Sequence, residues 1–357
     1  MSSKHYFACG NTAKGLISLS DSAFEELKKV YILDGGPGAG KSTLLKEIGT
    51  RLEKKGYHLD YIHSALEPDA LDAVLLPEKG IGVIDGSEMF NVAQAVVERV
   101  DLTKPLDMEK LADHTQDVLT YFNQFIGKRQ EAYDTFAASL RDHDDIEKVY
   151  ISNMDFEEAD TLTGELIDTF FGGGNKGTEG KITRRFLGAA TPVGAIDHIQ
   201  NLTEGIPDRF FIKGRAGSGK STMLKKIAAS GREKGFSVEV YHCGFDPNSL
   251  DMVILREQGI AIFDSTAPHE YFPSREGDHI VDMYERCITE GTDETYSREI
   301  EEATKGYKDK MKEAIQTLKE AKDFRDQMKG IYVDLMDFNE VEQITEELYH
   351  RIEVEIQ

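Results

Sequence analysis

Short apolar runs alternate with amphipathic stretches along two successive parts of the chain. Each run has the length of a buried strand, and the residues after the first run of each part repeat at helical spacing. The runs lie at 30–33, 59–63 and 81–84 in the first part and at 210–212, 238–242 and 260–263 in the second. Strands that alternate with helices predict βαβ units and a parallel sheet, with ligands at the carboxyl ends of the strands. The pattern therefore predicts an α/β fold in each part.

The two parts match one another residue by residue. Lys220 lies 179 residues after Lys41, and the same offset aligns residues of matching type over a long stretch without gaps. It pairs Gly56 with Gly235, His63 with His242, Pro68 with Pro247, Asp72 with Asp251 and Asp85 with Asp264. Farther along, Met154 matches Met336 at an offset of 182 residues. These matches predict a tandem duplication that covers nearly the whole chain.

A glycine-rich segment separates the two copies. Residues 172–180 contain five glycines, which is typical of a flexible connection. We therefore assign residues 1–171 to a first domain, 172–182 to a linker and 183–357 to a second domain. The alternative for the glycine-rich segment is a loop that contacts phosphate.

The last part of each copy is highly charged and helical. Apolar residues recur at steps of about three and four in residues 118–140 and 307–328, which predicts a long amphipathic helix in each copy. Such a helix can pack on its own domain. Because its apolar stripe is narrow, it can instead form an arm that pairs with the other arm, with a protein partner or by self-association.

The same motif follows the first strand of each copy. Residues 35–42 and 214–221 both match G-x-x-x-x-G-K-[ST], and each precedes a predicted helix. Glycines let the backbone form a concave group of N–H donors, and the helix N-terminus behind it favours a phosphate. The motif resembles the Walker A loop of the P-loop NTPases. That resemblance implies as nucleotide-binding residues Gly35, Gly38, Gly40, Lys41, Ser42, Thr43, Gly214, Gly217, Ser218, Gly219, Lys220, Ser221 and Thr222.

A second part of the pattern concerns magnesium. The third strand of each copy ends in an aspartate, Asp85 or Asp264, which looks like a Walker B residue. Such a carboxylate can hold Mg²⁺ beside the hydroxyl group of the loop serine, although it can also simply begin a turn. The predicted metal ligands are Ser42, Asp85, Ser221 and Asp264.

The residue that activates the attacking group is harder to identify. Many P-loop hydrolases place a glutamate just after the Walker B aspartate, but here Gly86 and Ser265 follow, and Glu88 is nearby in the first copy only. A carboxylate recurs after the second strand as Glu67 and Asp246, where it could orient water or accept a proton. The alternative is an Asx-type turn before the proline that follows each of them.

The copies diverge after the strand-end aspartates. In the second copy the loop is longer and more polar, and it places His269 and Arg275 where we expect the γ-phosphate. We therefore expect the second site to be the better candidate for turnover and the first to have a regulatory or structural role. The catalytic residues predicted for the second site are Lys220, Asp264 and Asp246.

The composition is that of an acidic globular protein. The 42 basic and 65 acidic residues give the 357-residue chain a net charge of −23, which repels nucleic acid and anionic membranes. No apolar run approaches the roughly 20 residues that span a bilayer, and the first residues lack the apolar segment of a signal peptide. Three cysteines form no CxxC pair, which is typical of a reducing compartment. We therefore expect a cytoplasmic protein without nucleic-acid or membrane partners.

The whole chain resembles a family of bacterial ATP-binding proteins with two P-loop halves, described mainly as predicted ATPases. The resemblance rests on His242-Cys243-x-x-Asp246-Pro247-x-Ser249-Leu250-Asp251, on Asp264-x-Thr266-Ala267-Pro268-His269 and on Gly188-x-x-Thr191-Pro192-x-Gly194. It implies ATP and Mg²⁺ as ligands but no particular reaction. The first copy keeps less of this pattern, and activity at its site is therefore in doubt.

Three functions follow from these residues. We expect Mg²⁺-dependent binding and hydrolysis of ATP, which would move the domains or helical arms against each other. The alternatives are a phosphotransferase that uses Asp246 or Glu67 as the base, and a nucleotide-gated binding module without turnover. No Asn-Lys-x-Asp motif follows either copy, so ATP rather than GTP is the expected nucleotide.

Overall fold

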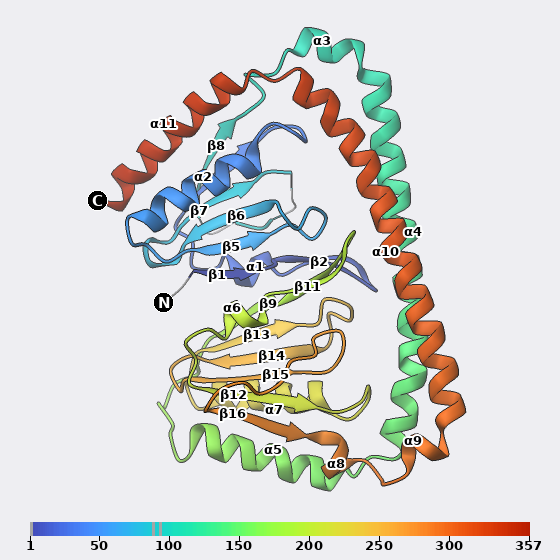
Figure 1. Ribbon diagram of the computed structural model, residues 1–357. Coiled ribbons are helices and arrows are strands. Elements are labelled where there is room, and N and C mark those ends of the chain that lie inside the picture. Colours follow the sequence, from blue (N-terminus) through green and yellow to red (C-terminus); the bar gives the residue numbers. More distant parts are fainter. Residues whose placement is uncertain (1–2, 88–89, 93–94) are drawn as a thin grey trace.

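Two similar α/β halves lie one above the other in the computed structural model, and two long helices run along one side of both (Figure 1). The structure describes residues 3–87, 90–92 and 95–357. Each half contains a six-stranded sheet and a two-stranded hairpin within the described residues. The predicted α/β class and the duplication are therefore confirmed at the level of the fold.

The elements follow nearly the same order in both halves. The first half contains β1 (Lys4–Tyr6), β2 (Cys9–Thr12), β3 (Gly15–Ser18), α1 (Ser20–Ala23), β4 (Lys29–Asp34), α2 (Lys41–Lys54), β5 (Asp60–His63), β6 (Leu71–Leu76), the 3₁₀ turn η1 (Pro77–Lys79), β7 (Ile81–Asp85), β8 (Val96–Asp101), α3 (Met108–Asp113), α4 (Thr115–Ser152) and α5 (Phe156–Phe171). The second half contains β9 (Ile182–Phe186), β10 (Gly188–Thr191), β11 (Gly194–Asp197), α6 (Ile199–Leu202), β12 (Asp208–Lys213), α7 (Lys220–Glu233), β13 (Val238–His242), β14 (Leu250–Leu255), β15 (Ile260–Asp264), β16 (Asp278–Asp282), α8 (Met283–Cys287), α9 (Thr292–Thr295), α10 (Ser297–Asp334) and α11 (Phe338–Ile356).

The sheets are mixed rather than purely parallel. Their strand orders are β1-β5-β6-β7-β4-β8 and, equivalently, β9-β13-β14-β15-β12-β16. The prediction of a parallel sheet is wrong at β6 and β14, which run antiparallel to both neighbours. Short turns at 64–70 and η1 flank β6, and a parallel connection needs a dozen or more residues. An apolar run does not reveal its direction, and the edge strands β8 and β16 escaped prediction altogether.

The two sheets meet at one edge through equivalent residues. Phe7 and Phe186, which the 179-residue offset aligns, form an antiparallel bridge with N–H···O distances of 3.1 and 3.0 Å. Pairing of a residue with its own repeat equivalent places the local two-fold axis of the duplication at this point. Helix α1 packs on β9 and α6 packs on β1, so neighbouring elements cross the same axis in both directions.

The closing helix of each copy packs on the sheet of the other copy. Phe170 of α5 shares a core with Ile227 of α7, whereas Ile352 of α11 shares a core with Ile48 of α2. The boundary at 172–182 therefore separates the copies in sequence. In space, each sheet is covered by one helix of its own copy and by the closing helix of the other copy. Helix α4 has 38 residues, which is about 57 Å of helix, enough to carry the chain past its own sheet.

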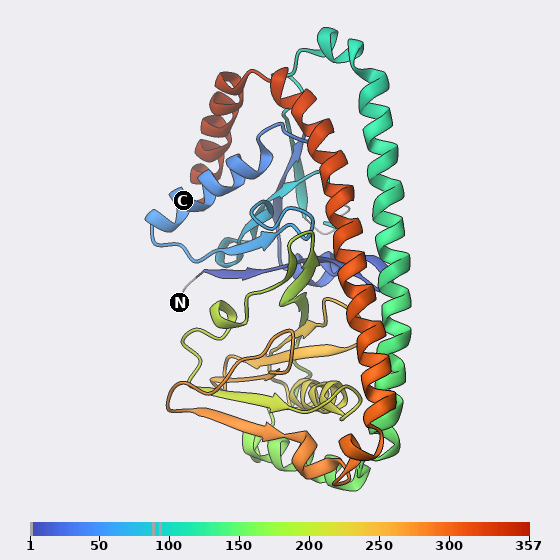
Figure 2. The same cartoon turned by 45° about the vertical axis from the view of Figure 1, so that its right-hand side comes forward.

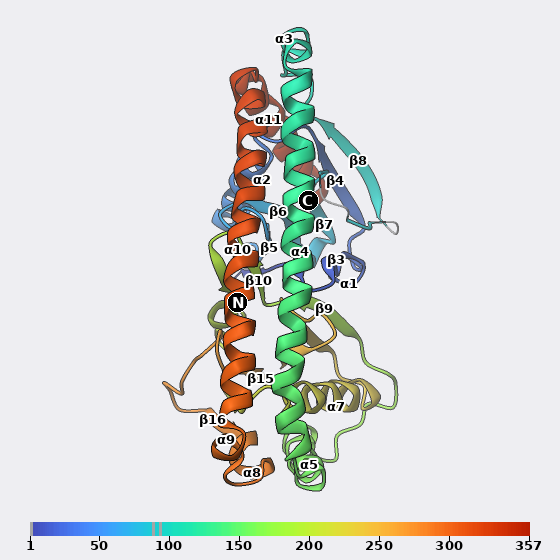
Figure 3. The same ribbon diagram turned by 90° about the vertical axis from the view of Figure 1, so that its right-hand side faces the viewer.

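Helices α4 and α10 form an antiparallel pair along the outside of both halves, as two views show (Figures 2 and 3). Near the middle, Ala132 and Phe136 pack with Ala314 and Leu318, and Ser139 Oγ donates to the Tyr307 carbonyl at 3.0 Å. Of the two arrangements considered for the predicted arms, the structure has the one in which each arm pairs with the other. Within the described residues, no helix combines the length and apolar character needed to cross a membrane.

The glycine-rich segment is packed rather than free. The N–H groups of Lys176 and Gly180 donate to the carbonyls of Lys234 and Arg232 at 2.9 and 2.8 Å. A Cβ atom at Gly180 would overlap the carbonyl of Phe236. These contacts place the segment against the end of α7, away from the glycine-rich loop at the start of that helix.

Candidate functional site

The first loop, which we define as residues 35–43, joins β4 to the start of α2. Gly38 and Gly40 have φ values of 84° and 86°, which L-residues with side chains rarely adopt. Helix α2 begins at Lys41, so the first N–H groups of the helix have no partner within it and are directed into the loop. Strand β4 pairs with β7 so that Leu33 faces Asp85, and this pairing brings the strand-end aspartate beside the loop.

The second loop, residues 214–222, repeats this backbone between β12 and α7. Gly217 and Gly219 have φ values of 76° and 85°, and α7 begins at Lys220. Strand β12 pairs with β15 so that Ile212 faces Asp264. The strand–loop–helix arrangement predicted for both motifs is therefore present in both copies.

The loop lysines lie beside the strand-end aspartates. Lys41 Nζ is 3.1 Å from Asp85 Oδ1, and Lys220 Nζ is 3.5 Å from Asp264 Oδ2. Each ammonium group also donates to a carbonyl of its own loop, that of Gly35 at 2.6 Å and that of Arg215 at 3.0 Å. Each lysine is thus held at the concave side of its loop, with a carboxylate next to it.

The serine that follows each lysine is oriented by the next strand. Ser42 Oγ accepts from the N–H group of Leu71, and Ser221 Oγ accepts from that of Leu250, both at 3.0 Å. Thr43 and Thr222 come next, on the exposed side of the first helical turn. The structure therefore brings together the predicted serine, lysine and aspartate in each copy.

Each loop lies against the long helix of the other copy. A Cβ atom at Gly36 would overlap the Tyr332 ring of α10, and one at Gly38 would be 2.9 Å from the Lys329 carbonyl. In the second copy, a Cβ atom at Gly217 would be 2.5 Å from the Glu147 carbonyl of α4. The first site is therefore formed by the first loop and α10, and the second site by the second loop and α4.

Two cations of α10 lie at the first site. Arg325 pairs with Glu67, and Lys329 Nζ is 2.8 Å from the other oxygen of the same carboxylate. Burial raises the pKa of Glu67, but Arg325 and Lys329 outweigh it and hold the pKa below its usual value. Glu67 is therefore an ionised carboxylate that is clamped by α10.

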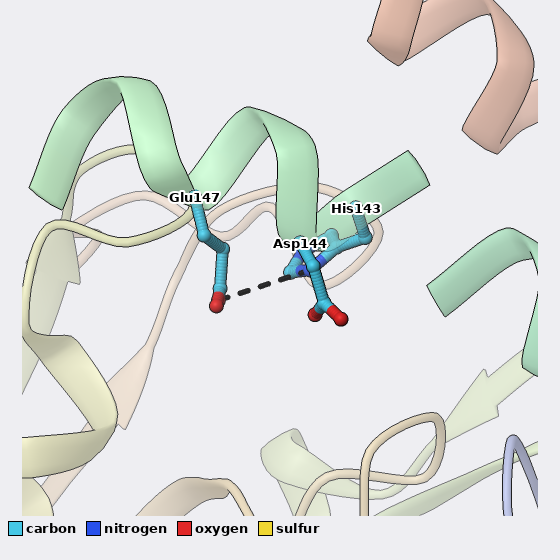
Figure 4. A group of neighbouring side chains, drawn as sticks. All are labelled: His143, Asp144 and Glu147. Atoms are coloured by element: carbon cyan, nitrogen blue, oxygen red, sulfur yellow. Dashed lines mark ion pairs between the residues drawn. The ribbon is translucent and has the colours of Figure 1, made fainter. Parts of the chain in front are cut away.

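The corresponding turn of α4 carries different charges. The 182-residue offset places His143 opposite Arg325 and Glu147 opposite Lys329. Figure 4 shows His143 and Glu147 directed toward one another, with Nδ1 and Oε1 3.8 Å apart. Burial raises the pKa of Glu147, while Lys220 and the Gly217 amide oppose that rise.

Other charged groups complete the second site. His143, Asp144 and Glu147 could offer oxygen and nitrogen atoms within 4.8 Å of one another, but a group of acidic side chains alone does not define a metal site. Arg215 takes the place of Gly36, and its guanidinium pairs with Asp293 at 3.0 Å.

The carboxylates predicted as bases have different surroundings. Asp246 accepts from the Asn248 N–H group at 3.2 Å and from Ser249 Oγ at 3.0 Å, which is the turn considered as the alternative to a catalytic role. Lys14 is 3.9 Å away from it. Glu67 instead pairs with α10, as described above. Glu88 lies outside the described residues.

The sequence predicts His269 and Arg275 near the γ-phosphate, and His242 ends strand β13. His242 Nδ1 lies 2.7 Å from the Pro247 carbonyl, so it caps its own turn. His269 is close to Asp264 and pairs with Asp197 at 2.8 Å. Arg275 lies with Asp278 at the beginning of β12, where its guanidinium donates to a carbonyl. The expectation that Arg275 approaches the γ-phosphate is wrong, because the loop is at the opposite end of that strand.

One buried carboxyl group escaped the sequence analysis. Asp251 lies in β14, and burial raises its pKa to about 6 although Lys220 and His269 favour its charged form. Perturbed carboxyl groups in a site are candidates for a chemical role. The signal was present in the sequence as an aspartate inside an apolar strand of both copies, Asp72 and Asp251.

Comparison of the chain with protein-family models, with curated proteins and with solved structures gave no match. Function therefore has to be inferred from the geometry and chemistry of the two sites.

Proposed function

We propose that the chain binds a magnesium nucleoside triphosphate at each of its two loops and hydrolyses ATP. The observation that supports this most strongly is the repeated placement of a helix-starting lysine 3.1 or 3.5 Å from a strand-end aspartate, above a loop with positive φ angles. Backbone N–H donors, an ammonium group and a helix N-terminus together favour a polyphosphate. ATP is the expected nucleotide because the chain lacks the Asn-Lys-x-Asp motif of guanine recognition.

The donor atoms near each loop also fit Mg²⁺. Serine hydroxyl and aspartate carboxylate oxygens are hard ligands of the kind that Mg²⁺ prefers, and Ser42 with Asp85, or Ser221 with Asp264, would hold it. When bound, Mg²⁺ would neutralise charge on the β- and γ-phosphates.

Hydrolysis at either loop would proceed by attack of water on the γ-phosphorus. The new P–O bond forms as the bond to the β–γ bridging oxygen breaks, and ADP, inorganic phosphate and a proton are released. Lys41 or Lys220 would move from its loop carbonyl to the phosphates and balance the charge that develops there. Glu67 and Asp246 are the carboxylates considered for orienting the water.

The two sites differ in what favours turnover. The second has the longer polar loop, with His269 and the buried Asp251, and the sequence favoured it. The first has Arg325 and Lys329, which can stabilise charge on a transferring phosphoryl group. Because carboxylates surround the second site, we propose that the first site contributes at least as much to turnover.

Phosphate release under steady state, with Mg²⁺ and ATP, tests this proposal. We expect release that needs no acceptor and that is lost in the Lys41→Ala/Lys220→Ala double variant. Release that depends on an added hydroxyl-containing acceptor would indicate a phosphotransferase instead. Tight binding without release would indicate a nucleotide-gated binding module.

A further inference from the structure

We infer that Arg325 and Lys329 of the second copy bind the terminal phosphate of a nucleotide held by the first loop. This inference rests on the proposed function, because it concerns the same site. It makes α10 part of that site and lets the second copy distinguish a triphosphate from a diphosphate in the first.

The contacts between α10 and the first loop bring these cations to the site. Tyr332 packs on the backbone of Gly36, and the Lys329 stem approaches Gly38, with Cγ 3.2 Å from a Cβ built there. Arg325 is one helical turn away from Lys329 on the same face of α10. Both cations therefore lie on the part of α10 that packs on the loop.

The carboxylate that holds both cations is itself tied to the loop. Glu67 lies in the turn that leads to Leu71, whose N–H group donates to Ser42 Oγ at 3.0 Å. Side chains of Glu67 and Arg325 are only 16% and 17% exposed. One carboxylate thus faces two cations, in the turn that supplies the N–H donor to the serine predicted to hold Mg²⁺ and in a chain with a net charge of −23.

The second copy of the site shows whether Arg325 and Lys329 are needed merely to pack the long helix on the loop. In α4, Leu140, His143 and Glu147 occupy the positions of Lys322, Arg325 and Lys329. That helix packs on the second loop as closely, with the Glu147 carbonyl 2.5 Å from a Cβ built at Gly217. Helix packing on the loop therefore does not require cations, so their presence in one copy needs another explanation.

The chemistry of these side chains matches a terminal phosphate. Arginine binds phosphate oxygens with two parallel N–H groups, and charge-assisted hydrogen bonds of this kind are roughly twice as strong as neutral ones. When phosphate enters, Arg325 and Lys329 exchange Glu67 for phosphate oxygens. The released Glu67 carboxylate then faces the γ-phosphate, where it can orient water.

The experiment compares triphosphate with diphosphate at the first loop alone. In a Lys220→Ala background, binding of a non-hydrolysable ATP analogue and of ADP, each with Mg²⁺, is measured by calorimetry. We expect Arg325→Gln and Lys329→Gln each to lower the affinity for the analogue about tenfold or more, as for loss of a charged hydrogen bond. The affinity for ADP should fall less than about twofold. Arg325→Lys retains part of the preference for the analogue.

Two controls separate this effect from loss of structure. Arg298→Ala removes an 84% exposed arginine of the same helix, and we expect it to change neither affinity. The Glu67→Gln/Arg325→Gln variant avoids leaving an unpaired carboxylate, and thermal melts verify that each variant folds.

Equal weakening of the analogue and ADP, or weakening of neither, would overturn the inference. If Lys41→Ala abolishes binding in the same background while Arg325→Gln has no effect, the first loop binds nucleotide without α10. If no nucleotide binds even with Lys41 present, the inference and the proposed function at this loop both fail.

Discussion

The two glycine-rich loops have nearly the same backbone, but the helical turns that face them carry different charges. Gly40 and Gly219 have φ values of 86° and 85°, and each loop leads into a 14-residue helix that begins at a lysine. On the facing helices, the pair Arg325 and Lys329 corresponds to His143 and Glu147. The geometry of the loop is thus retained in both copies, whereas the charge of the group opposite the loop is not.

Comparison of the two sites separates two effects that a single site would combine: the packing of a long helix on the loop and the charge of the turn that faces it. Packing of a long helix on a loop is satisfied equally by a cationic and by an acidic turn. We expect the charge of that turn instead to determine how the site responds to an anion, because a partly buried charge is only weakly screened. The comparison therefore predicts different affinities for triphosphate at two sites of similar shape.

The largest effect is expected from removal of the loop lysines. Lys41→Ala and Lys220→Ala should each weaken triphosphate binding at its own loop by about 100-fold or more, since each deletes an ammonium group that the proposed function places next to the phosphates. Calorimetric stoichiometry should fall from two to one in each single variant. If one substitution removes both binding events, the loops are not independent and the comparison has to be redrawn.

The local features of the site could be predicted from the sequence. Glycine spacing, the apolar strand before it and the helix after it are short-range signals, and they placed Lys41, Ser42 and Asp85 together correctly. The prediction succeeded because β4 and β7 are buried strands that end at the same edge of a sheet. The direction of β6 relative to its neighbours was not predictable, since a buried apolar run of this kind can form a parallel or an antiparallel strand.

The packing of each closing helix, α5 or α11, on the sheet of the other copy could not be predicted from the sequence. Both copies offer similar apolar residues to α5 and α11, so the hydrophobic pattern is compatible with packing on either sheet. The length of α4 decides the outcome, because a straight helix of 38 residues ends beside the other sheet. The partners of Glu67 were hidden for the same reason, since Arg325 is 258 residues away in the chain.

Core truncation tests the exchanged helices. Phe170 and Ile352 are repeat equivalents that are 4% and 1% exposed, and truncation of such side chains to alanine costs about 2–5 kcal/mol. Phe170→Ala should weaken the hydrogen-exchange protection of the β12–β15 amides in the second sheet. Ile352→Ala should weaken the protection of the β4–β7 amides in the first sheet. Loss of protection confined to the sheet of the same copy would contradict the exchange.

Acid should destabilise the contact between the two copies at a cluster of histidines, two from the first copy and one from the second, that has no counterpart at the repeat-equivalent positions. His5 Nδ1 and His63 Nε2 are 2.8 Å apart, and the His63 and His198 rings are 4.5 Å apart. Burial lowers the pKa of His63 to about 4 and that of His198 to about 3. Because both values lie below the unfolded value of 6.5, their stabilising contribution is complete above pH 6.5 and is lost as pH falls toward 4.

The free energy of unfolding should therefore fall between pH 6.5 and 4, by up to about 2 kcal/mol per histidine at pH 5, and the melting temperature should fall with it. His198→Asn should flatten this dependence. For comparison, His242→Asn in the second copy replaces a single histidine whose pKa burial also lowers, with Arg184 and Leu19 in place of the other two histidines, and we expect it to flatten the dependence less. A wild-type melting temperature that stays constant over this range would show that the cluster does not govern acid stability.

The most specific test converts the second site toward the first. Glu147→Lys places an ammonium group where Lys329 stands in the other copy and removes a carboxylate near Lys220 and the Gly217 amide. In a Lys41→Ala background, we expect affinity for a non-hydrolysable ATP analogue at the second loop to rise about tenfold, or about 1.4 kcal/mol. Glu147→Gln removes the repulsion without adding a cation and should give a smaller gain. If neither substitution strengthens binding, the charge on the facing helix does not control affinity, and the difference between the sites has to arise within the loops themselves, for example from Arg215 in place of Gly36.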